Sequence, residues 1–155
     1  MMSLGQQNFL TLNMIIIKRI NLQTCKRREM KRDELEKIIN EAFENKQQVS
    51  ENSDKKILDA ISETIELTDQ GDLRVAEKKN GSWSVNQWVK KAILLSFRVN
   101  KMVMSKGPYT TWYDKVPGKS VNWDENNWKK AGYRHVPNGV VRKGSFIAKG
   151  VVLMP

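Results

Sequence analysis

The last fifteen residues of the chain repeat with a period of six. Residues 141–146 read VRKGSF, residues 147–152 read IAKGVV, and a third unit is cut short as LMP. Hexapeptide repeats are typical of parallel β-helices, and about three or more repeats are needed for stability. We therefore expect an N-terminal domain followed by the first rungs of a β-helix truncated at Pro155. Its short extended pieces should direct Ile147 and Leu153 the same way and stay poorly covered.

The basic residues are concentrated in the C-terminal half. Residues 73–155 hold sixteen Lys or Arg against four Asp or Glu, whereas residues 30–72 hold six against twelve. A basic half suits an anionic partner such as nucleic acid, coenzyme phosphates, a small carboxylate substrate or an acidic subunit. A solvated basic surface explains the same charge equally well. The 155 residues, 39% of them hydrophobic, suffice for one domain with a buried core.

One cysteine and one histidine limit the chemistry of the chain. Cys25 has no second cysteine for an internal disulfide, which fits a reducing compartment. His135 lies far from Cys25 in sequence, so we expect neither a zinc site nor a Cys–His nucleophile pair. The apolar run at 14–17 is much shorter than the roughly 20 residues of a membrane span. We therefore expect a cytoplasmic protein without a bound metal.

The sequence becomes regular at Met30. We expect residues 1–29 to be a disordered extension or a mis-called translation start, with Met30 as the functional start. Asp33 and Glu36 fit a capping box for a first helix, because each side chain can bond the other's backbone amide. The apolar residues of this helix share one face: Leu35, Ile38, Ile39, Ala42 and Phe43.

A second helix is predicted after a polar interval. Ser53 is the expected N-cap, and Gly71 fits the C′ position because glycine adopts a left-handed conformation without a Cβ penalty. Further on, Asn80-Gly81 between apolar residues predicts a β-hairpin that joins residues 73–76 to Trp83. A third helix should begin near Ser84.

The segment after the third helix is harder to interpret. Residues 94–99 fit either the end of that helix or a strand, and residues 101–120 are expected to be mostly loop. Asp124 is expected to cap a fourth, short helix that Gly132 closes. Among the aromatic residues, Trp83 and Trp88 fit the core.

The sequence carries no self-sufficient catalytic motif. The signatures of a nucleophile elbow, a phosphate loop, a dinucleotide site and a zinc protease are absent. Asp114, Asp124 and Glu125 fit a turn former, a helix cap and a first-turn acid better than catalytic roles. Aromatic and basic residues interleave between positions 106 and 133, as on surfaces that bind single-stranded nucleic acid. The aromatic residues lack the alternation of an oligonucleotide-binding sheet, which argues against that function.

Arg134 is the candidate binding residue. It follows Gly132-Tyr133 at the point where the helical part meets the repeats, and domain junctions are favoured places for ligand pockets. A guanidinium offers two parallel hydrogen bonds to a carboxylate, which lysine cannot match. From these principles alone, an ordinary surface arginine remains the simpler explanation.

Several stretches match one known family. They read, in order, LRVAEK (73–78), QWVKKAILLSFR (87–98), YDKVP (113–117), GYR (132–134), VRKGSFIA (141–148) and VLMP (152–155). Their order and near-constant spacing are more specific than any single motif. Residues 30–155 resemble the N-terminal part of the tetrahydrodipicolinate N-succinyltransferases. The resemblance covers about four-fifths of this chain but less than half of a full family member, and residues 1–29 lie outside it.

The resemblance implies an acyl transfer in lysine and diaminopimelate biosynthesis. Family members move a succinyl group from the co-substrate succinyl-CoA to the amino group of ring-opened, hydrated tetrahydrodipicolinate. The products are N-succinyl-2-amino-6-oxopimelate and CoA, and no bound cofactor is implied. The resemblance further implies a homotrimer with active sites between neighbouring β-helices. The expected fold is α+β: an extension (1–29), a mostly helical domain (30–132), and a junction with the first rungs of a truncated left-handed β-helix (133–155).

Arg134 aligns with the family arginine that binds the dicarboxylate substrate. The family's acidic substrate-binding residue and its coenzyme A surfaces belong to coils beyond Pro155, so no catalytic or cofactor-binding residue is assigned here. Residues 100–110 depart from the family's usual polar loop. We expect the truncated chain to be inactive alone. Two alternatives are an assembly module that completes a separately encoded β-helix half and, less favoured, a basic nucleic-acid-binding protein.

Overall fold

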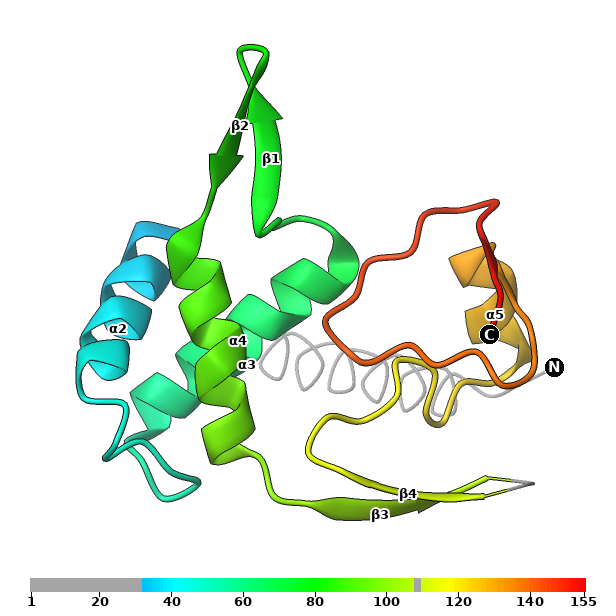
Figure 1. The fold of residues 1–155 in the computed structure, drawn as a ribbon, viewed down its shortest axis with the longest axis horizontal. Coiled ribbons are helices and arrows are strands. Elements are labelled where there is room, and N and C mark those ends of the chain that lie inside the picture. Colours follow the sequence, from blue (N-terminus) through cyan, green and yellow to red (C-terminus); the bar gives the residue numbers. More distant parts are fainter. Residues whose placement is uncertain (1–31, 108–109) are drawn as a thin grey trace, which may run out of the picture. The chain divides into compact units, whose positions relative to one another are not determined.

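The computed structural model describes residues 32–107 and 110–155 (Figure 1). The predictions for residues 1–29, including Cys25, and for Met30 as the functional start lie outside these residues. Helices and short strands are mixed along the described part, which confirms the α+β class. In chain order the elements are α2 (Arg32–Glu44), α3 (Lys55–Gln70), β1 (Ala76–Lys79), β2 (Ser82–Val85), α4 (Gln87–Val99), β3 (Val103–Lys106), β4 (Thr111–Asp114), α5 (Glu125–Ala131), β5 (Arg134–His135) and β6 (Val152–Leu153).

The core lies where α2, α3 and α4 pack against one another. Each of these helices has an apolar stripe, and the stripes meet because burying them removes apolar surface from water. Leu35, Ile39, Val89 and Leu95 are completely buried. Since α4 continues to Val99, residues 94–99 are helical and not a strand.

The ends of α2 and α3 only partly follow the prediction. The described part of α2 already includes Arg32, so Asp33 lies in its first turn and not at its cap. The N-cap of α3 is Asp54, whose carboxylate accepts the Lys56 amide at 2.7 Å, one residue after the predicted Ser53. Gly71 ends α3 in the left-handed conformation, as predicted, with φ +85°.

A β-hairpin forms around Asn80-Gly81, which confirms the prediction. Both turn residues have positive φ (50° and 84°), as a two-residue type I′ turn requires. The strands are β1 and β2, with Lys79 opposite Ser82. The predicted helix start at Ser84 is wrong, because that residue pairs within the hairpin. Trp83 is 72% exposed on this hairpin and not in the core, whereas Trp88 is buried as predicted.

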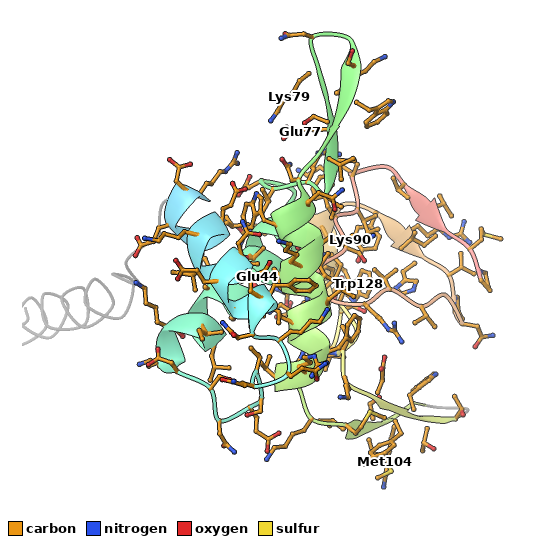
Figure 2. All side chains as sticks on the ribbon, turned by 60° about the vertical axis from the view of Figure 1, so that its left-hand side comes forward. Glu44, Glu77, Lys79, Lys90, Met104 and Trp128 are labelled. Atoms are coloured by element: carbon orange, nitrogen blue, oxygen red, sulfur yellow. The ribbon has the colours of Figure 1, made fainter. Side chains whose placement is uncertain are left out.

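Residues 101–120 contain more regular structure than the expected loop. Strands β3 and β4 form a second antiparallel hairpin, in which Val103 pairs with Asp114 and Met104 with Tyr113. Apolar side chains on this hairpin are exposed, and Figure 2 shows Met104 there, away from the helices. The loop prediction followed from Gly107-Pro108, Pro117 and Gly118, which lie at or beyond the ends of these two short strands.

Helix α5 forms as predicted from its capping residues. The Asp124 carboxylate accepts the Asn127 amide at 2.8 Å, and the Asn127 side chain accepts the Asp124 amide at 3.0 Å. The helix ends at Gly132, which has φ +67°. Tyr133 then leads directly into β5.

The repeat segment adopts a regular arrangement that follows its six-residue period. Strand β5 pairs in parallel with β6, so that Arg134 lies opposite Val152, three six-residue units later. Left-handed residues recur at the same interval: Gly132, Asn138, Gly144 and Gly150. Val141, Ile147 and Leu153 are each partly covered while their preceding neighbours are exposed, and no residue of 141–155 is buried. The prediction of a poorly covered, extended tail is therefore confirmed.

No helix within the described ranges is both long and apolar enough to cross a membrane.

Candidate functional site

Arg134 lies on β5 at the junction between the helical part and the repeats. Its amide donates to the Val151 carbonyl at 2.9 Å, which fixes the backbone of the strand. Successive side chains of a strand point to opposite faces, so Tyr133 and His135 face inward while Arg134 is exposed. Among the described residues no ion pair or side-chain hydrogen bond engages this guanidinium. It can therefore present its paired N–H donors to an external carboxylate.

The inward side of this strand rests on an aromatic cluster. The ring centroids of Trp128 and Tyr133 lie 5.6 Å apart at 74°, and those of Trp123 and Trp128 lie 4.9 Å apart at 71°. The His135 ring lies 5.9 Å from Trp128. Edge-to-face contacts of this kind stabilise beyond simple burial. The cluster therefore supports the strand that carries Arg134.

Two buried polar atoms of this cluster have no hydrogen-bond partner within the described part of the chain. They are the Tyr133 hydroxyl and His135 Nε2. Burial, and to a smaller degree the charge of Asp69, raises the pKa of the Tyr133 phenol. The phenol therefore stays neutral, and it does not act as a base here.

A buried ion pair joins α3 to the segment that leads into the repeats. Lys119 Nζ lies 2.7 Å from Asp69 Oδ2, and the two side chains are only 8% and 17% exposed. The other carboxylate oxygen of Asp69 accepts the Gly144 amide at 2.7 Å. One carboxylate thus attaches both Lys119 and a corner of the repeat segment to the C-terminal turn of α3.

Two further ion pairs, both more exposed than the first, attach the same corner of the repeat segment. Lys143 Nζ lies 3.1 Å from Glu66, and Arg142 lies 2.8 Å from Asp114. The hydrogen bond from Lys143 is the main reason that the pKa of Glu66 lies below its ordinary value. Both interactions are partly solvated and are worth little individually. With Asp69 they fix how the first repeat lies on α3.

The same elements enclose a groove of about 900 Å³. Its walls come from α3, the end of α4, β3, residues 114–121 and residues 142–145. The lining is mostly apolar, including Ile61, Ile65 and Phe97. Two of its ion pairs lie within the lining, Glu51 with Lys101 and Asp114 with Arg142, whereas Lys143 pairs with Glu66 and Lys115 donates to a backbone carbonyl. Arg134 is not part of this groove.

The other acids singled out in the sequence have structural roles, as expected. Asp114 pairs with Arg142, Asp124 caps α5, and Glu125 pairs with Lys129 one helical turn later. Two of the interleaved lysines also make internal contacts. Lys115 donates to the Phe97 carbonyl at 2.7 Å, and Lys119 pairs with Asp69. These two lysines therefore serve internal contacts, whereas Trp112 and Tyr113 are exposed.

Asp69 is the residue that sequence reasoning missed. Nothing near it in the sequence distinguishes it from the other acids of α3, because its partners lie fifty and seventy-five positions away. Among the residues that the structure places, no group of three or more His, Cys, Asp or Glu side chains could hold a metal ion.

Comparisons with known proteins agree with this organisation. Residues 34–99 match a family described as tetrahydrodipicolinate N-succinyltransferase N-terminal. A 2,3,4,5-tetrahydropyridine-2,6-dicarboxylate N-succinyltransferase of Pelagibacter ubique is 59% identical over 79% of this chain and 46% of its own length. Proteins of the same name from Agrobacterium fabrum and a Psychrobacter species are 51% and 52% identical over 78% of the chain.

The chain spans about half the length of these curated relatives, because the matched part is 44 to 46% of each of them. The matched family domain contains α2, α3 and α4, the three helices that form the core. The alignment also extends past that domain, over four-fifths of the chain. These comparisons confirm that the chain resembles the N-terminal part of the tetrahydrodipicolinate N-succinyltransferases.

Proposed function

We propose that residues 30–155 serve as the N-terminal part of a tetrahydrodipicolinate N-succinyltransferase. In this proposal the complete enzyme transfers succinyl from succinyl-CoA to the acceptor, in the cytoplasm and as a homotrimer. The observation that carries the proposal is the 59% identity with a relative of that name over 79% of the chain. The aligned length of 125 residues is greater than that of the family domain at residues 34–99.

Arg134 is proposed to bind a carboxylate of the acceptor. Three observations support this role: Arg134 is exposed, its guanidinium is not paired within the described ranges, and aromatic rings pack together on the inward side of its strand. A dicarboxylate is the ligand that a bidentate guanidinium prefers. The groove between α3 and β3 is less suitable for this substrate, because its lining is mostly apolar and its four basic side chains already have partners within the described residues.

Residues 133–155 are proposed to be the first coil of a left-handed parallel β-helix. The parallel pairing of Arg134 with Val152 supports this, since three six-residue units separate two positions on one side of a coil. The left-handed residues at every sixth position support it as well, because each marks a corner between two sides. One coil leaves its apolar column uncovered, so further coils should stack on it.

Joining this chain to a relative's remaining coils tests the proposal. Residues 30–155 would be fused to the C-terminal part of the Pelagibacter ubique enzyme, and thiol release from succinyl-CoA would be measured with and without acceptor. We expect acceptor-dependent CoA release from the fusion and none above background from residues 1–155 alone. A correctly assembled fusion without activity, or robust turnover by residues 1–155, would overturn the proposal.

Variants of the same fusion test the role of Arg134. Losing charge-assisted hydrogen bonds of about 1.5–3 kcal/mol each predicts that Arg134→Ala lowers kcat/KM by at least about tenfold. Arg134→Lys should recover only part of the loss, because an ammonium cannot bind both oxygens in parallel. Arg98→Ala is a matched control on α4, where Arg98 contacts only Gln47 at 3.4 Å. Equal losses for Arg134→Ala and the control would exclude substrate binding.

A second candidate is an assembly module that completes a separately encoded β-helix half. Strand β6 pairs with β5 on one edge only within the described residues, and Val140, Phe146 and Val152 are exposed beside it. Co-expression with the relative's coils as a separate polypeptide, followed by co-purification, distinguishes this candidate from a continuous enzyme. The less favoured hypothesis of nucleic-acid binding requires that the protein bind an oligonucleotide at low salt and that this affinity fall steeply as salt is added.

A further inference from the structure

The turn of the β1–β2 hairpin places an asparagine and a glycine together at an exposed tip. Asn80 and Gly81 are both exposed, and a side chain added at Gly81 would meet no atom within 4 Å. Lys79 pairs directly with Ser82, so these two residues alone make the turn. No backbone hydrogen bond from the Gly81 amide is found in the described part of the chain.

This arrangement leaves a nucleophile and an electrophile next to each other. The Gly81 amide nitrogen follows the Asn80 side chain directly, and a five-membered ring forms when that nitrogen bonds to the side-chain carbonyl carbon. Glycine favours the step, because it has no Cβ to shield the nitrogen or to restrict the backbone rotation. The tip lies at the end of a two-stranded hairpin, where local opening is easy.

A second Asn-Gly pair in the same chain is held differently. The Gly139 amide donates to the Val136 carbonyl at 3.0 Å, which occupies its proton. A Cβ built at Gly139 would lie 2.8 Å from the His135 ring, so the glycine is packed against that ring. Asn138 therefore has the same neighbour as Asn80 but neither the free amide nor the room to rotate.

We propose that Asn80 is a site of spontaneous deamidation and that Asn138 is protected by its fold. The Gly81 nitrogen forms a bond to the Asn80 side-chain carbon and loses its proton, and ammonia leaves. One water molecule then opens the succinimide at either carbonyl, giving aspartate or isoaspartate at position 80. Water is the only co-reactant, and no electron transfer takes place.

The modification changes both the charge and the geometry of the hairpin. A new carboxylate appears directly after Lys78 and Lys79, and it competes with Glu77, which now lies 2.9 Å from Lys79 Nζ; Figure 2 shows Glu77 and Lys79 on this hairpin. Isoaspartate also inserts an extra backbone carbon into a turn of only two residues. The pairing of Lys79 with Ser82 then loses its register.

The experiment follows both asparagines in the same sample. The purified 155-residue protein is aged at mildly alkaline pH, and peptide mass spectrometry with isoaspartate detection reports positions 80 and 138. We expect conversion at Asn80 to exceed that at Asn138 by at least about tenfold, since only the first glycine amide is free. In denaturant the two rates should become similar, because the fold no longer protects Asn138.

Two variants complete the test. Gly81→Ala should slow conversion at Asn80 several-fold, because a Cβ shields the amide. The methyl group would meet no atom within 4 Å, so its only cost is the backbone strain at φ +84°. His135→Ala should remove the ring that packs against Gly139 while keeping the glycine amide unshielded, and so raise conversion at Asn138. Conversion at Asn138 equal to or faster than at Asn80 in the folded protein, or no conversion at Asn80 when the denatured protein reacts, would overturn the proposal.

Discussion

Removing the buried carboxylate of Asp69 should destabilise the fold more than removing an exposed carboxylate. The carboxylate lies 2.7 Å from Lys119 Nζ and accepts the Gly144 amide at the same distance. Asp69→Ala leaves the Lys119 ammonium, which is only 8% exposed, with the backbone carbonyl of residue 69 at 3.2 Å but without its counter-charge. It also leaves the Gly144 N–H without its acceptor. Breaking one side of a buried pair costs about 3–5 kcal/mol in the free energy of unfolding.

Removing the charge of Lys119 should reduce the free energy of unfolding by less than removing the carboxylate of Asp69. In Lys119→Met the Asp69 carboxylate keeps the Gly144 amide and is 17% exposed, so water solvates part of its charge. It stays, however, at the C-terminal end of α3, where the helix dipole disfavours an anion by about 0.3–1 kcal/mol. We expect a loss of about 2–3 kcal/mol, below the range for a fully buried charge.

Urea unfolding of both single variants and of the double variant measures the coupling between the two side chains. The double variant should be less destabilised than the sum of the singles by at least about 2 kcal/mol, because neither charge remains unpaired. Glu125→Ala is the matched control: its pair with Lys129 is 70–82% exposed and should contribute less than about 0.5 kcal/mol. Additive losses, or an Asp69→Ala loss no larger than the control, would refute the reasoning.

Three further predictions concern stability. Gly71→Ala should destabilise by at least about 1 kcal/mol more than Gly81→Ala; both positions have φ near +85°, but only at Gly71 would the Cβ fall 2.6 Å from the Phe146 ring. Tyr133→Phe should raise the free energy of unfolding by about 1 kcal/mol, since it removes a buried unpaired hydroxyl. It should also abolish a loss of stability that begins above pH 10.0, because a raised folded-state pKa makes the unfolded state release the proton first. Glu66 has a lowered pKa, so its pH dependence is the reverse. Its contribution to the free energy of unfolding is present above pH 4.5 and is lost as the pH falls through the lower folded-state pKa. Glu66→Gln should therefore reduce the loss of stability at acid pH, as measured in thermal melts.

Local rules predicted the elements that depend on a few adjacent residues. The positive φ at Gly71, at Asn80-Gly81 and at Gly132 follows from glycine and asparagine where the chain must turn. The cap at Asp124 follows from an acid three residues before an amide side chain. These features need no knowledge of the rest of the chain, so they could be located to within a residue.

Features that depend on distant parts of the chain could not be predicted. Trp83 is a large apolar residue of the kind expected in a core, but it lies on the hairpin and is 72% exposed. The pairing of β3 with β4 depends on cross-strand contacts more than on propensity. The position of Arg134 at the junction was predictable, because Gly132 ends a helix and the repeats follow. Its role in substrate binding stays a prediction.

The left-handed corners at every sixth position make residues 132–150 intolerant of small changes in length. Inserting one residue after Asn138 would move Lys143 and Lys149 into the corners that Gly144 and Gly150 now occupy, where φ is +97° and +79°. Such positive φ values are strained for residues that have a Cβ. The same insertion would shift His135 off its partner Leu153. The length of this segment can therefore change without penalty only by a whole coil of three hexapeptides, about eighteen residues. Related sequences should differ here by that number of residues or by none.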